Sequence, residues 1–200
     1  RSSSEFGADY EATLVSLETG FFFQPVSGVY TGFKNSYTHN YIGDLKRDRI
    51  VNVMQSILYF KPSTYHLLAL RTVSSFAWRH KANYRTVLGG DNGLRGYPDR
   101  YFNGTRLALV NTEYRVFSPI EILTVGLGGA LFFDAGYIWD EHEKIGLSDL
   151  RSNIGLGLRF GLTKSSTARI IRLDVARALS DDNWFISFGT ENLFSLARFQ

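Results

Sequence analysis

Residues 122–138, ILTVGLGGALFFDAGYI, decide the fold class because apolar side chains recur there at every second position. One face carries Leu123, Val125, Leu127, Gly129, Leu131, Phe133, Ala135 and Tyr137. The other face carries Thr124, Gly126, Gly128, Ala130, Phe132, Asp134 and Gly136. Alternation over this length exceeds the roughly 5 to 6 residues of a typical strand in a soluble sheet, and it favours a long, tilted barrel strand.

The same period-two pattern recurs along the second half of the chain. Residues 154–162 set Ile154, Leu156, Leu158, Phe160 and Leu162 against Asn153, Gly155, Gly157, Arg159 and Gly161. Residues 170–176 set Ile171, Leu173 and Val175 against Arg172 and Asp174, and residues 104–117 set Ala108, Val110, Tyr114 and Val116 against Asn111, Glu113 and Arg115. We therefore expect each strand to have one apolar face and one wet, lumenal face.

These patterns predict an all-β fold, a transmembrane antiparallel β-barrel with eight strands per chain. The strands are expected near residues 8–18, 49–60, 65–78, 104–117, 122–138, 150–162, 167–179 and 184–194. Short turns at 61–64, 118–121 and 163–166 then alternate with longer connections at 19–48, 79–103 and 139–149, and 180–183 is a short exception. Short periplasmic turns opposite longer extracellular loops are typical of outer-membrane barrels.

Composition is compatible with this fold and excludes several others. The chain has 200 residues, of which 44% are hydrophobic and 20% charged, and it has no cysteine. These values describe one ordinary domain and exclude disorder and a disulfide scaffold. No apolar run reaches the roughly 18 residues of a transmembrane helix, whereas a barrel strand needs only about 9 to 11. The net charge of +3 is small and scattered, so no nucleic-acid partner is expected.

Aromatic residues gather where the expected strands would cross the two membrane interfaces, which favours a lipid bilayer as a partner. On the long-loop side these are Phe76, Trp78, Tyr137, Trp139 and Trp184, and on the short-turn side Tyr59, Phe60, Phe117, Phe160 and Phe194. A soluble β-sandwich or ligand-binding barrel remains the alternative, since its strands also alternate.

Three segments carry a family resemblance: GGDNGLRGY at residues 89–97, NTEYR at 111–115 and FFDAGYIW at 132–139. In this order they resemble the C-terminal barrel of the bacterial surface antigen family, the BamA and TamA type of outer-membrane assembly protein. Five strands follow the corresponding loop in that family, and five are expected here. The resemblance implies that the chain supplies the last eight of sixteen strands.

The resemblance also implies a loop that folds back into the barrel and is held there by its tip. The implied loop-anchoring residues are Leu94, Arg95, Gly96 and Tyr97, and the implied lumenal partners are Glu113, Asp134 and Gly136. A turn at Pro119–Ile120 would offset the two carboxylates by about eight residues, or roughly 27 Å, so Arg95 would reach only one of them unless the turn is longer. The alternative is an exposed arginine in a glycine-rich turn, with Asp134 solvated and Glu113 paired across strands.

No residue pattern supports catalysis or a cofactor. Glycines 126, 128 and 129 lie inside a strand rather than between a strand and a helix, which argues against nucleotide binding. The four histidines, His39, His66, His80 and His142, lack metal-ligand spacing, and no Ser, His and acid arrangement stands out. We therefore expect a protein that is not an enzyme and that binds neither a metal nor another cofactor.

An eight-strand barrel is only wide enough for its own side chains, so a lumenal loop requires a wider barrel. Two copies could close a sixteen-strand barrel, because the expected first and last strands run in opposite directions; otherwise an N-terminal half-barrel is missing. The expected segments are a periplasmic one at 1–7, the barrel at 8–194 and a tail at 195–200. The resemblance implies insertion or translocation of unfolded outer-membrane protein clients in the bacterial outer membrane. The alternatives are a passive pore and the membrane anchor of a patatin-type enzyme.

Overall fold

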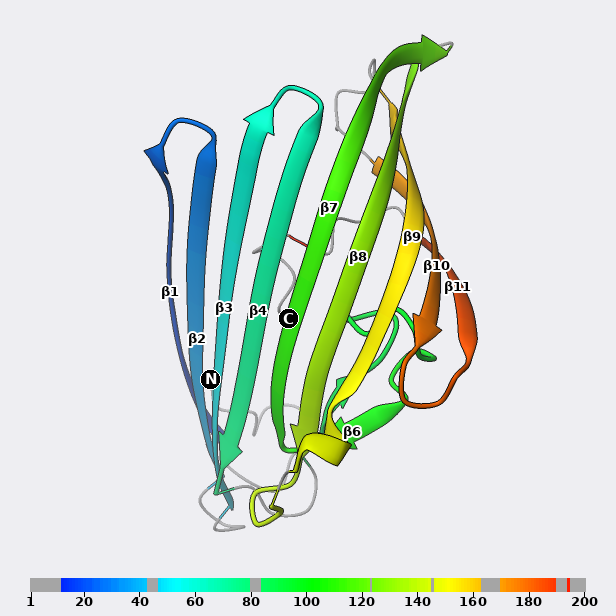
Figure 1. The fold of residues 1–200 in the computed structure, drawn as a ribbon. Helices are drawn as coiled ribbons and strands as arrows, with labels where there is room; N and C mark the ends of the chain where they lie inside the picture. The colour runs from blue at the N-terminus through cyan, green and yellow to red at the C-terminus, as the bar shows by residue number, and fades with distance from the viewer. Residues whose placement is uncertain are drawn as a thin grey trace.

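The computed structural model describes residues 12–42, 47–79, 84–122, 124–144, 146–162, 170–189 and 194. Within them, one antiparallel sheet of nine strands has the order β1-β2-β3-β4-β7-β8-β9-β10-β11 (Figure 1). The strands are β1 Ala12–Val26, β2 Val29–Ile42, β3 Arg47–Ser63, β4 His66–Trp78, β7 Arg106–Ile122, β8 Val125–Trp139, β9 Arg151–Leu162, β10 Ile170–Ala178 and β11 Trp184–Gly189. A small second sheet pairs β5 Thr86–Leu88 with β6 Phe102–Gly104, and a 3-10 turn covers Leu147–Asp149.

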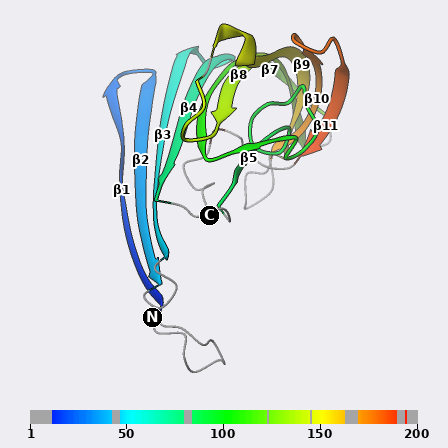
Figure 2. The same ribbon diagram turned by 90° about the horizontal axis from the view of Figure 1, so that it is seen from below.

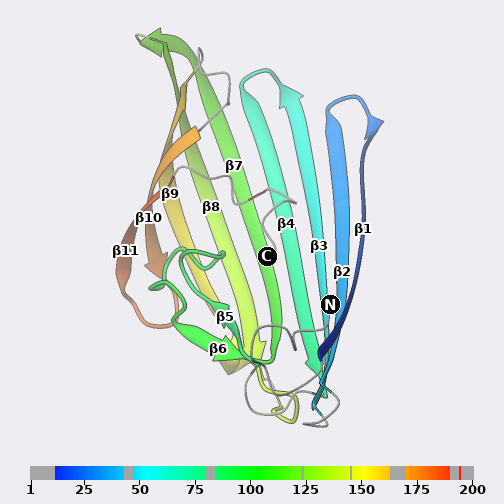
Figure 3. The ribbon, with the colours of Figure 1, turned by 180° about the vertical axis from the view of Figure 1, so that it is seen from behind.

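The main sheet is curved, and its β7–β11 part bends most strongly (Figure 2). Residues 84–105, which we call the inner loop, lie on the concave side of β8–β10 (Figure 3). β1 and β2, β3 and β4, and β7 and β8 are joined at one end of the sheet, which we call the short-turn end. The inner loop and the β8–β9 connection leave from the opposite, long-loop end. No helix in these described ranges is long and apolar enough to cross a membrane.

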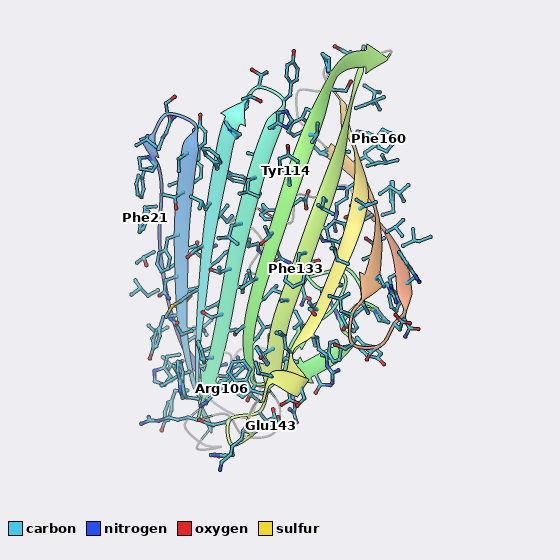
Figure 4. The ribbon with its side chains drawn as sticks, in the orientation of Figure 1. Phe21, Arg106, Tyr114, Phe133, Glu143 and Phe160 are labelled. Atoms are coloured by element: carbon cyan, nitrogen blue, oxygen red, sulfur yellow. The ribbon has the colours of Figure 1, made fainter. Side chains whose placement is uncertain are left out.

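From β7 to β10 the two faces of the sheet differ in chemistry as the alternating sequence predicts. Leu131, Phe133 and Leu156 project from the convex face and are 49%, 41% and 66% exposed. The concave face instead carries buried polar and charged side chains, among them Asn111, Glu113 and Asp134. Figure 4 shows Tyr114 and Phe133 along the middle of the sheet, and Arg106 and Glu143 at the long-loop end. An apolar outer face with a polar inner face is the arrangement of membrane barrels.

The prediction of eight strands is wrong, because the described sheet has nine. Residues 19–48 were expected to form a loop, but β1 continues to Val26 and β2 pairs with both of its neighbours along Val29–Ile42. The chain reverses at Ser27–Gly28, where Gly28 has a φ of 78°, which suits glycine. β2 lacks an apolar alternation because polar residues stand on both faces: Asn52 of β3 donates to Asn35 on one face, and Lys34 pairs with Glu18 on the other.

The expected turn at residues 118–121 is also wrong, because these residues belong to β7. A bulge between Phe117 and Glu121 shifts the register, and the pairing then continues to Ile122 opposite Val125. β7 is therefore longer, and β8 starts later, than the sequence pattern predicts. The expected turn at 163–166 lies outside the described residues, as does the start of the strand expected at 167–179.

Among the described strands, β1 and β11 are the two edges of the sheet. Nine antiparallel neighbours place the first and last strands in the same direction. The expected antiparallel meeting of these edges in a two-copy barrel was derived from an even number of strands, and it does not apply to the described sheet. A single nine-strand sheet also differs from the two packed sheets of a β-sandwich.

Candidate functional site

The inner loop ends in a compact tip held by its own backbone. The amides of Gly93 and Leu94 donate to the Gly89 carbonyl at 3.1 and 2.8 Å, and the Tyr97 amide donates to the Leu94 carbonyl at 3.0 Å. Asn92 closes the turn through its side chain, which accepts from the Gly89 amide and donates to the Val87 carbonyl. The glycine-rich sequence therefore forms an ordered turn whose Arg95 has a defined direction.

Two glycines let this tip closely approach the concave face of the main sheet, which we call the wall. Gly93 has a φ of 141°, and a Cβ there would collide with Leu109 of β7. Gly96 has ordinary backbone angles, but a Cβ there would overlap the side chain of Asn153 on β9. Both positions therefore require glycine for the loop to lie against the concave face.

Apolar contacts flank the arginine on the long-loop side. Leu88, Leu94 and Tyr97 of the inner loop form a buried cluster with residues of three strands, β4, β7 and β10: Val73, Leu107, Leu109 and Ala178. The Tyr97 ring meets Phe102 edge to face, with 5.1 Å between ring centroids. The cluster contains loop residues before and after Arg95 in the sequence, so it fixes the loop and directs the guanidinium to a defined place.

The Arg95 side chain is fully buried and binds carboxylates on two strands, β7 and β8. Its Nε and Nη2 donate to the two oxygens of Asp134 at 2.9 and 2.8 Å, a bidentate contact. Its Nη1 donates to Oε2 of Glu113 at 2.7 Å and lies 3.7 Å from Asp174. The guanidinium carbon is 3.5 Å from the centre of the Phe132 ring. Charge-assisted bidentate bonds with an aromatic floor are a geometry that arginine provides and lysine does not.

The register explains how one arginine reaches both carboxylates. Asn111 pairs with Asp134 and Glu113 pairs with Phe132, so the carboxylates are two residues apart along the wall, or about 7 Å. The expected offset of eight residues is wrong, because β7 extends through the bulge to Ile122. On β9, a Cβ at Gly155 would collide with the Phe132 ring, so glycine leaves room for this ring beneath Arg95.

Each carboxylate has further partners on the wall. Asp134 accepts from Asn111 and Asn153 at 2.8 and 2.9 Å. Glu113 accepts from Arg115 at 2.7 Å and from Arg159 at 2.8 Å, both through Oε1. Asp174 accepts from Arg159 and Arg172. We call the seven charged residues of this network the ion cluster: Arg95, Glu113, Asp134, Asp174, Arg115, Arg159 and Arg172.

Burial and charge act in opposite directions on the inner-loop arginine. Burial alone would lower the pKa of Arg95, but the attraction of Asp134, its hydrogen bonds to Arg95, and the Glu113 and Asp174 carboxylates outweigh it and raise the pKa. Arg95 therefore carries its charge at any physiological pH, and the contact with the wall is ionic throughout.

The structure brings together most of the residues singled out from the sequence. Leu94, Arg95, Gly96 and Tyr97 all lie against the concave face, and Glu113 and Asp134 both contact Arg95. Gly136 has no side chain to offer the loop; a Cβ there would press on Leu88 and Leu109, so its role is to leave space for the inner loop.

Sequence reasoning did not select the other members of the site. Alternation predicts the wet face for Asp174 and Arg172, but their depth along the sheet depends on the register across β8, β9 and β10. Alternation also predicts the concave face for three further residues, but nothing else in the sequence identifies them as members of the site: Asn111, Asn153 and Arg159. Phe194 was expected to end the last strand in an aromatic girdle; instead it is buried on the concave side, next to Tyr59 and Ala69.

The described part of the chain contains no group of three or more His, Cys, Asp or Glu side chains placed to hold a metal ion. The acidic side chains of the ion cluster face arginines rather than one another. The site is a contact between a loop and the concave face, built on charge pairs.

A curved antiparallel sheet with an apolar outer face and a loop held on its polar inner face fits the class of outer-membrane β-barrel proteins. A family model described as the Omp85 superfamily domain matches residues 10–184, and the chain belongs to this superfamily. Its members are bacterial outer-membrane proteins, and the match confirms the resemblance to the BamA and TamA type of surface antigen. A search of curated proteins found no match.

Proposed function

We propose that this chain forms part of an outer-membrane barrel that inserts or translocates proteins, and that its inner loop is anchored to the lumenal wall by Arg95. Membership of the Omp85 superfamily supports the coarse function. The observation that carries the anchoring role is the fully buried Arg95 side chain on Glu113 and Asp134. Replacing the arginine would leave the buried Asp134 carboxylate without a cation, which makes the docked position of the loop strongly preferred.

The convex face supports the membrane part of the proposal. Its exposed side chains in the middle of β8 and β9 are Leu131, Phe133, Ile154, Leu156 and Leu158. In water, a contiguous apolar surface of this kind would drive association, whereas lipid chains cover it without cost. In a bilayer the same strands would satisfy their backbone groups within the sheet.

We propose that further strands close the barrel between β11 and β1. Because these two described edges run in the same direction, an odd number of antiparallel strands must stand between them. The sixteen strands of the family would leave seven for that gap, which is odd. A closed single-chain barrel with an even strand count then follows. Two identical nine-strand sheets would instead meet through parallel edges, so a homodimer is the less favoured arrangement.

Omp85 members are generally non-enzymatic translocation and assembly proteins, and we extend this to the present chain. The ion cluster then has a mechanical role: it holds a loop across part of the lumen and leaves the remaining space for a client. A passive pore uses the same wall but requires no client, so the two functions differ in what they transport.

The test is reconstitution of the purified chain, together with any strands it is found to pair with, into lipid vesicles. An unfolded outer-membrane barrel is then added, and its insertion is followed by protease protection. We expect insertion to be faster than in empty vesicles, and Arg95→Ala to reduce the effect more than the control Gly129→Ala, where a Cβ would have no neighbour closer than 4.0 Å. Ion conductance without any acceleration of client insertion would contradict the proposal and indicate a passive pore.

A further inference from the structure

Phe194 lies on the concave side of the sheet, beside strands that are not neighbours of β11. The side chain is only 2% exposed and packs against Ala69 and Tyr59. The Tyr59 hydroxyl donates to the Phe194 carbonyl at 2.6 Å, and the two ring centroids are 6.4 Å apart. The Arg115 guanidinium carbon is 5.1 Å from the centre of the Phe194 ring. Its neighbours therefore belong to β3, β4 and β7.

This position departs from the register of β11. Gly189 pairs with Arg172 on β10, and β10 is three places from β7 in the sheet. If β11 continued in the same register, residue 194 would share the convex face of Ile186 and Phe188, because all three positions are even. Phe194 is instead on the concave side, within the roughly 17 Å that five extended residues can span. The ring therefore lies on the concave side, beside β3, β4 and β7, and not on the convex face of β11.

The same arginine links this ring to the inner loop. Arg115 Nε donates to Oε1 of Glu113 at 2.7 Å, and Oε2 of Glu113 accepts from Arg95 at 2.7 Å. Phe194, Arg115, Glu113 and Arg95 therefore form a continuous chain of contacts. A ring over a guanidinium attracts it electrostatically and shields it from water, which strengthens the charge pair on its other side.

We propose that Tyr59, Ala69 and Arg115 form a docking site for the Phe194 ring, and that its occupancy strengthens the hold of Glu113 on Arg95 and so keeps the inner loop in place. The coupling is reciprocal: release of the loop weakens the Phe194 site, and release of Phe194 loosens the loop. The proposal goes beyond the proposed function, because it requires no client and no transport.

The experiment measures hydrogen exchange of the inner-loop amides, residues 89–97, in the full chain in detergent micelles. We expect Phe194→Ala and Phe194→Leu to accelerate this exchange by roughly two- to fivefold, the factor for one cation–π contact, because neither offers a π face to Arg115. Phe194→Tyr restores the ring and is expected to restore slow exchange. Phe188→Ala is the matched control, since Phe188 is 70% exposed on the convex face.

The second part of the experiment repeats the hydrogen-exchange measurement in the Arg115→Gln background. In that background the route from the ring to Glu113 is missing, so Phe194→Leu is expected to add no further acceleration. Equal acceleration by Phe194→Leu with and without Arg115 would overturn the proposal, as would unchanged exchange of residues 89–97 in Phe194→Leu. Phe194→Leu retains an apolar side chain against Ala69, so we expect the sheet to stay folded. Unchanged hydrogen exchange of the β7–β9 amides verifies this.

Discussion

Replacing Arg95 with alanine removes the centre of the ion cluster while leaving its carboxylates in place. Glu113 retains Arg115 and Arg159, and Asp174 retains Arg159 and Arg172. Asp134 loses both of its charged hydrogen bonds and retains the side-chain amides of Asn111 and Asn153 and the backbone amide of residue 95. The main consequence of Arg95→Ala is therefore one buried carboxylate without a cation.

The magnitude follows from that loss. Breaking a buried ion pair by removing one partner costs about 3 to 5 kcal/mol. Arg95→Lys retains the charge but cannot reproduce the fork that engages Asp134 through two nitrogens, so a loss of about 1.5 to 3 kcal/mol is expected. The predicted order of stability is wild type, then Arg95→Lys, then Arg95→Ala.

Asp134→Asn tests whether Arg95 and Asp134 interact directly, through the sign of its effect on stability in two backgrounds. In the wild-type background this change removes the charge that faces Arg95 and is expected to destabilise the protein. In the Arg95→Ala background it neutralises the orphaned carboxylate, so it is expected to recover about 1 to 3 kcal/mol. The two effects have opposite signs only if Arg95 and Asp134 act on each other directly.

Urea unfolding in lipid vesicles, followed by tryptophan fluorescence, measures all four proteins of this cycle. The unfolding midpoint reports the stability, and an unchanged slope shows that the same surface unfolds. A direct interaction between Arg95 and Asp134 would be contradicted if Asp134→Asn destabilised both backgrounds equally, or if Arg95→Ala left the midpoint within error of wild type.

Three further predictions concern the wall, the outer face and the sheet edges. Gly157→Ala is expected to destabilise the protein strongly, because its Cβ would displace the ends of the Asp174 and Arg159 side chains, which pair with each other in the ion cluster. Gly129→Ala is expected to have little effect; urea midpoints compare the two, and equal midpoints would contradict the packing. Leu131→Arg is expected to cost about 2 to 4 kcal/mol in vesicles if residue 131 lies near the bilayer midplane, and a neutral effect would argue against lipid contact. Native mass spectrometry in detergent is expected to give one chain per particle, and a stable two-chain species would contradict closure by further strands.

Much of the fold could be predicted because alternation is a local property. Leu156, Leu158 and Phe160 identify the outer face of β9 from spacing alone, and β8 and β10 follow in the same way. β2 could not be recognised, because Lys34, Asn35 and Ser36 break the apolar alternation on both faces. Its strand character depends on pairing with β1 and β3, which is a long-range property that a local pattern does not contain.

The site illustrates the same limit at the level of register. The face of Glu113 and Asp134 follows from period two, so their shared lumenal side could be predicted. Their relative depth depends on where the chain reverses, and the bulge after Phe117 moves that point away from Pro119. Phe194 could not be placed by any periodic pattern, because its contacts with Tyr59 and Arg115 cross the concave side of the sheet.

We propose that one face of this sheet meets lipid and that the other encloses the inner loop, and site-directed labelling tests this arrangement most directly. Because the chain has no cysteine, single cysteines at Leu131, Leu156 and Ser75 can each carry a nitroxide without background. Leu131 and Leu156 lie on the convex face, and Ser75 is buried on the concave face. In bilayers, we predict high accessibility to lipid-dissolved oxygen at Leu131 and Leu156, and low accessibility at Ser75. Equal oxygen accessibility on both faces, or preferential access of a water-soluble nickel reagent to Leu131 and Leu156, would contradict it.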